Sequence, residues 1–256
     1  MIVLYEVQDH VAKITLNRPE LLNALTVEMR ELLGNYFEQA ARDSNVRCVL
    51  LQANGPTFCA SGDVNKMGAF TPASSQELLK LAHRVIRNLA NIEKPVVASV
   101  RGAVAGIGWS MAMACDMIVA SETAHFSQVF KNIGLVPDGG AIYFLTQYLG
   151  VLKAKELVMS GKRISAQEAH QLQLVNQVVA DDVLDSLAWD KAVELAKGPT
   201  FAFGVAKKMF KSMNQPSLET FLDNEAWSQG LALLTDDHKE GFKAFLEKRK
   251  PVFKGH

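Results

Sequence analysis

Three short loops hold the residues of this chain whose types and spacing are best suited to chemistry. The first is FCASGDV (58–64), the second runs from Gly102 to Gly108, and the third is VPDGG (136–140). A buried helix of small and apolar residues is expected directly after the second loop. Its first turn would present unpaired backbone N–H groups at the positive end of the helix dipole, and such groups stabilise a negatively charged oxygen.

Other chemistries that glycine loops and histidines can support are excluded by the spacing. Gly106 and Gly108 are followed by Met111, where a dinucleotide-binding loop requires a third glycine. The spacing from Gly102 to Gly106 does not fit a Walker phosphate loop, and no Lys-Ser/Thr pair follows it. No two histidines lie three to five residues apart, so a compact zinc motif is absent and no metal site is expected.

The loops must be positioned by the elements around them, which alternate between strands and helices. β-rich or continuous apolar runs predict strands at 2–7, 11–16, 46–51, 96–100, 117–120, 125–126 and 174–179. Amphipathic stretches and capping residues predict helices from Thr26 to about Arg42, from Ser74, from about Ala141 to Gly150, and from Ser165. This alternation predicts an α/β fold with mainly parallel strands, in which ligands bind at the carboxyl ends of the strands.

Composition limits the class of protein and of partner. The 256 residues are 48% hydrophobic and carry a formal net charge of zero, which fits one large domain or a main domain with a helical appendage. The neutral balance argues against nucleic acid or an anionic membrane as the main partner. Three cysteines without ligand spacing indicate reduced thiols in a cytoplasmic protein, and neither a signal peptide nor a transmembrane segment is expected.

Taken together, the motifs of this chain resemble the crotonase superfamily, the enoyl-CoA hydratase/isomerase family. They occur in family order over nearly the whole chain and are highly specific as a set. The matching segments are LNRP (16–19), NAL (23–25), FCASGDVNKM (58–67), KPVVASVRGAVAGIG (94–108), ACD (114–116), IGLVPDGG (133–140), SGKRISAQEAHQLQLVNQVV (160–179) and FLEKRKPVFK (245–254).

The resemblance implies a fold, an assembly and a substrate. Residues 1–195 would form a crotonase-like spiral of ββα units that binds acyl-CoA, and residues 196–256 a helical trimerisation region. The assembly would be a trimer or a dimer of trimers. The substrate would be an acyl-CoA thioester, with CoA as part of the substrate and no further cofactor.

The resemblance also implies the residues of the site. The backbone N–H groups of Ala60 and Ile107 fall where the family holds the oxygen of a thioester enolate. The residues expected to bind CoA or substrate are Gly106, Ser61, Gly62, Asp63, Val64, Phe130, Phe245 and Lys248. Asp63 is equally suited to structuring its own loop, and Lys248 to a solvated helix face.

The acid/base is where the chain departs from typical hydratases of the family. Those enzymes carry two glutamates, at the positions held here by Ser110 and Phe130. Hydration needs one group for the water and another for the α-proton, so its usual mechanism is not expected. Asp138 remains, at the position where isomerases of the family place a carboxylate. A double-bond shift needs one carboxylate, so Asp138 is the expected acid/base, and an apolar neighbour such as Phe130 would raise its pKa.

Other interpretations stay open from the sequence. Hydration, thioester hydrolysis or dehalogenation are alternative reactions, the last two with Asp138 as nucleophile, although dehalogenases carry a tryptophan where Phe130 stands. A non-catalytic acyl-CoA-binding scaffold would also explain the missing glutamates. Out of context, Asp138 would be a turn or N-cap residue. We expect Cys59 to be a small buried residue, and His83 a surface or core residue.

Overall fold

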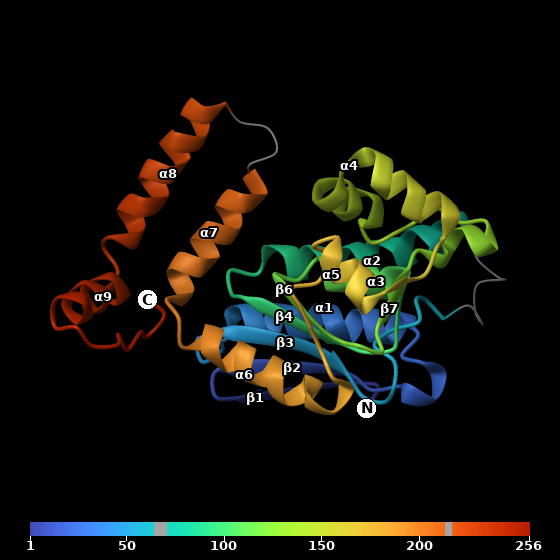
Figure 1. The fold of residues 1–256 in the computed structure, drawn as a ribbon, viewed down its shortest axis with the longest axis horizontal. Coiled ribbons are helices and arrows are strands. Elements are labelled where there is room, and N and C mark those ends of the chain that lie inside the picture. The colour runs from blue at the N-terminus through green and yellow to red at the C-terminus, as the bar shows by residue number, and fades with distance from the viewer. Residues whose placement is uncertain (64–70, 213–216) are drawn as a thin grey trace.

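The central element of the fold is a six-stranded sheet with the order β1-β2-β3-β4-β6-β9 (Figure 1). The computed structural model describes residues 1–63, 71–212 and 217–256, so the expected site residue Val64 lies outside the described residues. β1 and β2 form an antiparallel hairpin, and every other neighbouring pair in this sheet is parallel. The strands are β1 (Val3–Gln8), β2 (Val11–Leu16), β3 (Cys48–Ala53), β4 (Val96–Val100), β6 (Met117–Ser121) and β9 (Gln177–Val179).

A smaller three-stranded sheet has the order β5-β7-β8, with bounds Ala103–Ala105, His125–Ser127 and Ile164–Ser165. The pairs β4–β5 and β6–β7 each give one strand to each sheet, and a helix follows each pair. This is the ββα repeat that the resemblance implied. The expected α/β class with mainly parallel strands is confirmed.

The central strands β3 and β4 of the large sheet are apolar on both faces because helices cover both. Val49 and Leu51 of β3 belong to the core under α1 (Val27–Arg42) and α2 (Pro72–Asn91). Their neighbours Cys48 and Leu50 point the other way, against α6 (Leu184–Ala196). Alternate residues of one strand therefore fill two cores, which explains its continuous apolar sequence.

α3 (Ile107–Met113) lies inside the molecule, and all seven of its residues are buried. Its position depends on close approach of backbone, because a Cβ at Gly108 would lie 2.6 Å from the Cβ of Cys59. The expected buried helix after the glycine loop is confirmed. It places Ile107, its first residue, directly beside the loop that follows β3.

The boundaries of two helices, α2 and α4, differ from the sequence prediction. α2 begins at Pro72, before the predicted Ser74, because Thr71 is its N-cap and Ser74 supplies the returning bond of the capping box. α4 (Ala141–Ser160) is interrupted at Gly150, whose φ of 76° and ψ of 164° are not helical. The predicted helix end at Gly150 is therefore present, but a second helical segment follows it at once.

The C-terminal helices extend to one side of the sheet core. They are α7 (Thr200–Ser212), α8 (Leu218–Ala232) and α9 (Asp236–Leu246), whereas α5 (Ala166–Gln171) lies against the small sheet. Figure 1 shows α8 and α9 apart from α3. The expected boundary between residues 195 and 196 falls at the last turn of α6. Within the part of the chain that the structure describes, no helix has the length and apolar character that a membrane crossing needs.

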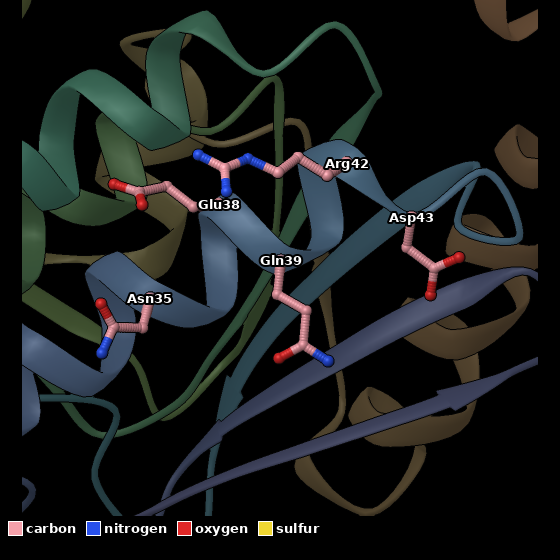
Figure 2. Close-up of a pocket in the computed structure, with 5 residues that line it drawn as sticks. All are labelled: Asn35, Glu38, Gln39, Arg42 and Asp43. Atoms are coloured by element: carbon pink, nitrogen blue, oxygen red, sulfur yellow. The ribbon is translucent and has the colours of Figure 1, made fainter.

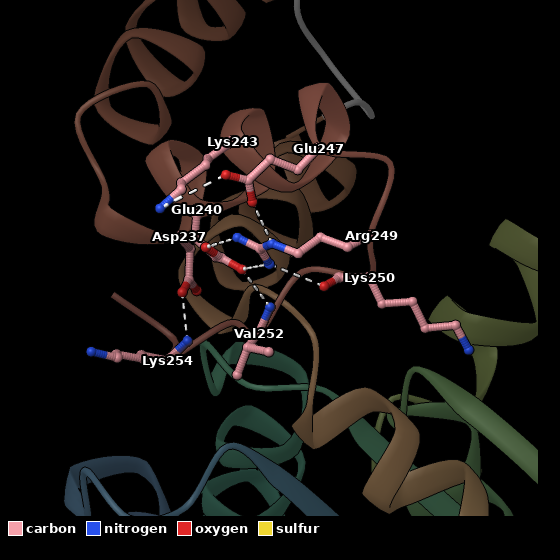
Figure 3. Close-up of polar contacts among 8 residues, drawn as sticks. All are labelled: Asp237, Glu240, Lys243, Glu247, Arg249, Lys250, Val252 and Lys254. Carbon is pink, nitrogen blue, oxygen red and sulfur yellow. Dashed lines mark hydrogen bonds and ion pairs between the residues drawn. The ribbon is translucent and has the colours of Figure 1, made fainter.

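The last residues of the chain are fastened back onto α9 by polar contacts (Figure 3). The Arg249 guanidinium makes a two-pronged contact with Glu240, donating to its two carboxylate oxygens at 2.5 and 2.9 Å. Buried Asp237 accepts the backbone N–H groups of Lys254 and Gly255 at 2.6 and 2.8 Å. The tail motif that carried part of the resemblance thus has a structural role, which is to close the chain end over α9.

Candidate active site

The loop after β3 is positioned by the segment that follows β2. Asn23 is fully buried, and its side-chain amide donates to the carbonyls of Asn54 and Thr57 at 3.0 and 2.7 Å. Its side-chain oxygen accepts the N–H of Arg18 at 2.8 Å, and Arg18 in turn pairs with Asp63 at 2.7 Å. These contacts hold both ends of the loop. They explain why the segment after β2 and the loop after β3 occur together as motifs.

Backbone pairing fixes which way each N–H of this loop points. Cys59 forms a bridge with Val104, and Gly62 forms a bridge with Leu25. In the second bridge the Leu25 N–H donates to the carbonyl of Ser61 at 2.9 Å, and the Asp63 N–H donates to the carbonyl of Leu25 at 3.1 Å. The N–H of Gly62 therefore points away from Leu25, because successive peptide groups of an extended chain alternate in direction.

The structure corrects one expected oxyanion donor. The N–H of Ala60 donates to the carbonyl of Leu22 at 3.0 Å, so it is already used within the fold. Among the described residues, the N–H of Gly62 has no acceptor, although Gly62 is buried. Ala60 and Gly62 differ in this way because the loop pairs with Leu22 and Leu25. Sequence patterns alone do not reveal that these two residues lie beside the loop.

The second loop brings its backbone against the first. Gly106 has a φ of 51°, and a Cβ there would lie 2.1 Å from the Oγ and 2.8 Å from the Cβ of Ser61. The ring of Phe130 would be 3.4 Å from the same Cβ. Ser61 itself has a φ of 99°, a conformation that side-chain-bearing residues rarely adopt. Gly106 and the peptide of Ile107 thus lie beside the Ser61–Gly62 segment and under Phe130.

The third loop carries Asp138 to the same place. A Cβ at the next residue, Gly139, would lie 2.9 Å from the Cβ of Ser110 and 3.2 Å from the Cγ1 of Ile107. The Ser110 hydroxyl donates to the backbone carbonyl of Asp138 at 3.0 Å. The structure therefore brings Ile107, Ser110 and Asp138 together, as expected from the three loops, and Ser110 holds the loop in place.

The Asp138 carboxyl is poorly solvated. Its Oδ1 is buried and has no hydrogen-bond partner within the described structure. Burial raises the pKa of Asp138, and the positive charges of Arg30 and His83 oppose that rise. A carboxylate in such a place is a stronger base than one in water, which is a common property of catalytic carboxylates.

Neither of the two positions where typical hydratases carry glutamates supplies a carboxylate here. Ser110 is fully buried and donates to a backbone carbonyl, and Phe130 is 5% exposed. Cys59 is buried too, and burial raises the pKa of its thiol to about 12, so it is neutral near pH 7. The expectation that Cys59 is a small buried residue agrees with this.

Arg30 is a residue of this region that the sequence prediction passed over. It lies on the apolar stripe of α1, between Met29 and Leu33, and is 2% exposed. A charged residue within an apolar helix face is a signal that sequence reading can detect. Its neighbours Cys59 and Asp138 are recognised only in the fold.

The remaining expected binding residues lie in two places. Asp63 is on the first loop, where its ion pair with Arg18 structures the chain. Phe245 is in the last turn of α9, and Lys248 follows the end of that helix. Figure 1 shows α9 on the other side of the molecule from α3. Phe245 is 81% exposed, and Lys248 has a φ of 54° at the turn that ends the helix. Within one protomer these two residues are not part of the Asp138 site.

Two surface hollows lie elsewhere and do not suit the expected chemistry. Figure 2 shows the first, on the outer face of α1, lined by Asn35, Glu38, Gln39, Arg42 and Asp43. The second lies between α2 and α7, where Lys207 pairs with Asp116 and Lys208 with Glu93. Neither hollow is lined by residues of the three loops.

Comparison with known proteins agrees with this architecture. The sequence pattern of the family described as enoyl-CoA hydratase/isomerase matches residues 6–256. The chain is 37% identical to 1,2-epoxyphenylacetyl-CoA isomerase of Escherichia coli, covering 99% of this chain and 98% of that protein. It is 32% identical to short-chain-enoyl-CoA hydratase of Clostridium acetobutylicum, covering 97% of this chain and 95% of that protein.

Solved structures show the same fold. The crystal structure of an enoyl-CoA hydratase from Bacillus anthracis superposes with a TM-score of 0.95 at 31% identity, covering 100% of each chain. The two sheets, the buried helix and the three convergent loops are therefore those of a crotonase-fold acyl-CoA enzyme. The chain belongs to the enoyl-CoA hydratase/isomerase family.

Proposed function

We propose that this enzyme shifts a carbon–carbon double bond in an acyl-CoA thioester, converting 3-enoyl-CoA to 2-enoyl-CoA. One observation carries the proposal: the loop of Asp138 packs against Ile107 and Ser110, and neither Ser110 nor Phe130 supplies a carboxylate. A double-bond shift moves one proton between two carbons and needs one acid/base. Addition of water usually needs a second group.

The proposed reaction begins with proton removal. The Asp138 carboxylate takes a proton from C2 of the substrate, and the electron pair moves onto the thioester oxygen as a dienolate. The same carboxyl, now protonated, returns the proton to C4, and the double bond moves to C2–C3. No atom is gained or lost and no redox change occurs, so the step needs no cofactor beyond the CoA of the substrate.

The enolate oxygen requires fixed donors, and two backbone N–H groups are suitable. We assign these to Ile107 and, in place of Ala60, to Gly62. Support comes from the Ser61–Gly62 segment, which lies against Gly106, and from the Gly62 N–H, which points away from its bridge with Leu25. Each such donor typically contributes roughly 3–4 kcal/mol to transition-state stabilisation.

The test is incubation with a series of 2-enoyl-CoA and 3-enoyl-CoA esters in deuterated water. Mass spectrometry then separates isomerisation from hydration, which adds a water, and from exchange at C2. Asp138→Asn should lower kcat by about 10²–10⁴-fold while leaving binding of the CoA ester intact. Asp185→Asn, an exposed aspartate paired with Arg101, is the matched control and should keep full activity.

The same experiment also tests the alternative functions, which are hydration, hydrolysis or dehalogenation, and a non-catalytic scaffold. Hydration that persists in Asp138→Asn would overturn the proposed mechanism, as would full isomerase activity in that variant. A covalent aspartyl adduct on Asp138 would indicate hydrolysis or dehalogenation instead. Tight binding of all esters without turnover would indicate a scaffold.

We also propose that copies of this chain associate through the C-terminal helices, as a trimer or a dimer of trimers. α8 has no buried residue, and large apolar side chains are exposed on α8 and α9. Trp227 and Phe242 are 78% and 60% exposed. Association would cover this surface, and it would allow Phe245 and Lys248 to contact CoA bound to a neighbouring copy.

A further inference from the structure

Phe130 connects the two loops that carry the proposed enolate donor and the proposed acid/base. A Cβ at Gly106, the residue directly before Ile107, would lie 3.4 Å from the Cε2 of the Phe130 ring. The backbone carbonyl of Phe130 accepts the N–H of Leu135 at 3.0 Å, at the start of the segment that leads to Asp138. The ring therefore lies against the glycine loop, and its backbone is bonded to the chain that carries the carboxyl.

The turn that contains Phe130 is fixed in this position. It is a short 3₁₀ turn, η3 (Val129–Ile133), and directly before it the Ser127 carbonyl accepts the N–H of Gly106 at 3.0 Å. The side chain of Phe130 is held among these segments, and the residue is only 5% exposed. Hydrogen bonds on both sides of the turn thus keep a buried ring beside the glycine loop.

The two side chains that flank the glycine loop give water no hydrogen to bind. The Ser110 hydroxyl is directed at backbone carbonyls, that of Asp138 at 3.0 Å and that of Gly106 at 3.3 Å. The side chain of Phe130 has no polar atom. A buried water molecule typically needs about two to four polar partners. Ser110 and Phe130 therefore favour a dry space on this side of the Asp138 loop.

We propose that Phe130 is a specificity-determining residue, whose ring closes the space between the Gly106 loop and the Asp138 loop to water. This inference rests on the proposed function, in which Asp138 carries a proton from C2 to C4. While the proton is on the carboxyl, a water molecule in contact with it would exchange the proton with the solvent. An apolar wall prevents that loss. It also keeps water from C3, where addition would give a 3-hydroxyacyl-CoA instead of the isomer.

The test follows a deuterium label through a single turnover. 3-Hexenoyl-CoA with deuterium at C2 is converted in ordinary water, and NMR with mass spectrometry measures the label that reaches C4 of the product. The wild type should retain most of the label. Phe130→Ala removes the ring and admits water, so the label at C4 should be largely lost. Phe130→Leu keeps an apolar side chain and should restore most of the retention.

Phe144→Ala is the matched control, because it removes a phenyl ring from another part of the same loop. A Cβ at Gly140 would lie 3.1 Å from the Cε2 of Phe144. Turnover should fall in this variant if packing is disturbed, but the fraction of label retained should equal that of the wild type.

A purely structural role of Phe130 predicts a different result from the proposal. It would lower kcat in Phe130→Ala and leave the retained fraction unchanged, and that outcome would overturn the proposal. If Phe130→Ala does not fold, Phe130→Gln is the variant to use, because it keeps much of the volume and offers hydrogen bonds to water. Wild-type retention in Phe130→Gln counts equally against the proposal.

A measurement without turnover separates this inference from the proposed function. If the wild type does not convert 3-hexenoyl-CoA, the proposed function fails, and the role of Phe130 is read from a bound ester. Hexanoyl-CoA labelled with ¹³C at the thioester carbonyl is bound, and its carbonyl stretch is recorded by infrared spectroscopy. Entry of water should broaden this band and shift it to lower wavenumber in Phe130→Ala. Identical bands in the wild type and Phe130→Ala would refute the role of Phe130, whatever the reaction is.

Discussion

At the scale of single residues, the environment of Asp138 predicts a conflict between activity and stability. Burial raises the pKa of this carboxyl above that of an unfolded chain, so keeping it ionised in the fold costs stability. The full loss of stability applies at pH values above the pKa of Asp138 in the folded protein. It disappears at pH values below the pKa of Asp138 in the unfolded chain, where the carboxyl is protonated in both states. Asp138→Asn should therefore raise the melting temperature at pH 7, and the gain should shrink as the pH falls toward about 4.

A second buried aspartate provides the contrast for this prediction. Asp237 is buried and accepts the backbone N–H groups of Lys254 and Gly255 at 2.6 and 2.8 Å. Asp237→Asn removes a charge that has partners, so it should destabilise the fold by about 1–3 kcal/mol. Thermal unfolding of both variants at two pH values distinguishes a carboxylate with an unpartnered buried oxygen from one with hydrogen-bond partners on both oxygens. A loss of stability in both would contradict our view of Asp138.

Gly106 is the residue at which a single methyl group should be most damaging. Gly106→Ala places a Cβ 2.1 Å from the Oγ of Ser61, and its φ of 51° adds conformational strain. We expect a loss of about 2–5 kcal/mol in unfolding free energy, together with loss of activity. Gly134 has a φ of 69° and open space around its would-be Cβ, so Gly134→Ala isolates the strain, at about 1–2 kcal/mol. Denaturant unfolding measures both, and equal losses would mean that the close approach to Ser61 is unimportant.

At the scale of elements, the loop after β3 depends on Asn23. Asn23→Ala leaves the carbonyls of Asn54 and Thr57 without their shared donor, at a cost of about 2–3 kcal/mol. Because that loop carries Gly62, activity should fall as well. Asn54→Ala removes an exposed contact to Asn17 and should cost under about 0.5 kcal/mol. Urea unfolding and steady-state rates together test whether this loop is held in the way described.

At the scale of the whole molecule, the C-terminal helices should control assembly. Trp227→Glu with Phe242→Glu places charge on the exposed apolar surface of α8 and α9 and should shift the protein toward monomer. Light scattering after gel filtration measures the change, and circular dichroism should be unaltered. Val183→Glu, at an exposed apolar position on the sheet core, is the control. A monomeric wild type would contradict the proposed association.

Much of the fold could be predicted from the sequence, because the signals are local. Thr26 is the N-cap of α1 and Ser165 is the N-cap of α5, as predicted from their side chains. The continuous apolar run of β3 was expected for a strand buried on both faces. The prediction for α2 was wrong in one respect. Ser74 was predicted as the N-cap, but Thr71 is the N-cap and Ser74 is the N3 residue of the same capping box.

The set of loops and the kind of chemistry they can support are readable from the amino-acid sequence alone. Glycine at 106, a carboxylate at 138, and the lack of a carboxylate at 110 and 130 are visible without a structure. Two further features became visible only in the folded chain: which backbone N–H of the first loop is used, and which side chain holds the Asp138 loop. The N–H of Ala60 donates to the carbonyl of Leu22, and the hydroxyl of Ser110 donates to the carbonyl of Asp138. Both outcomes depend on contacts between distant segments, which local propensity and periodicity do not encode.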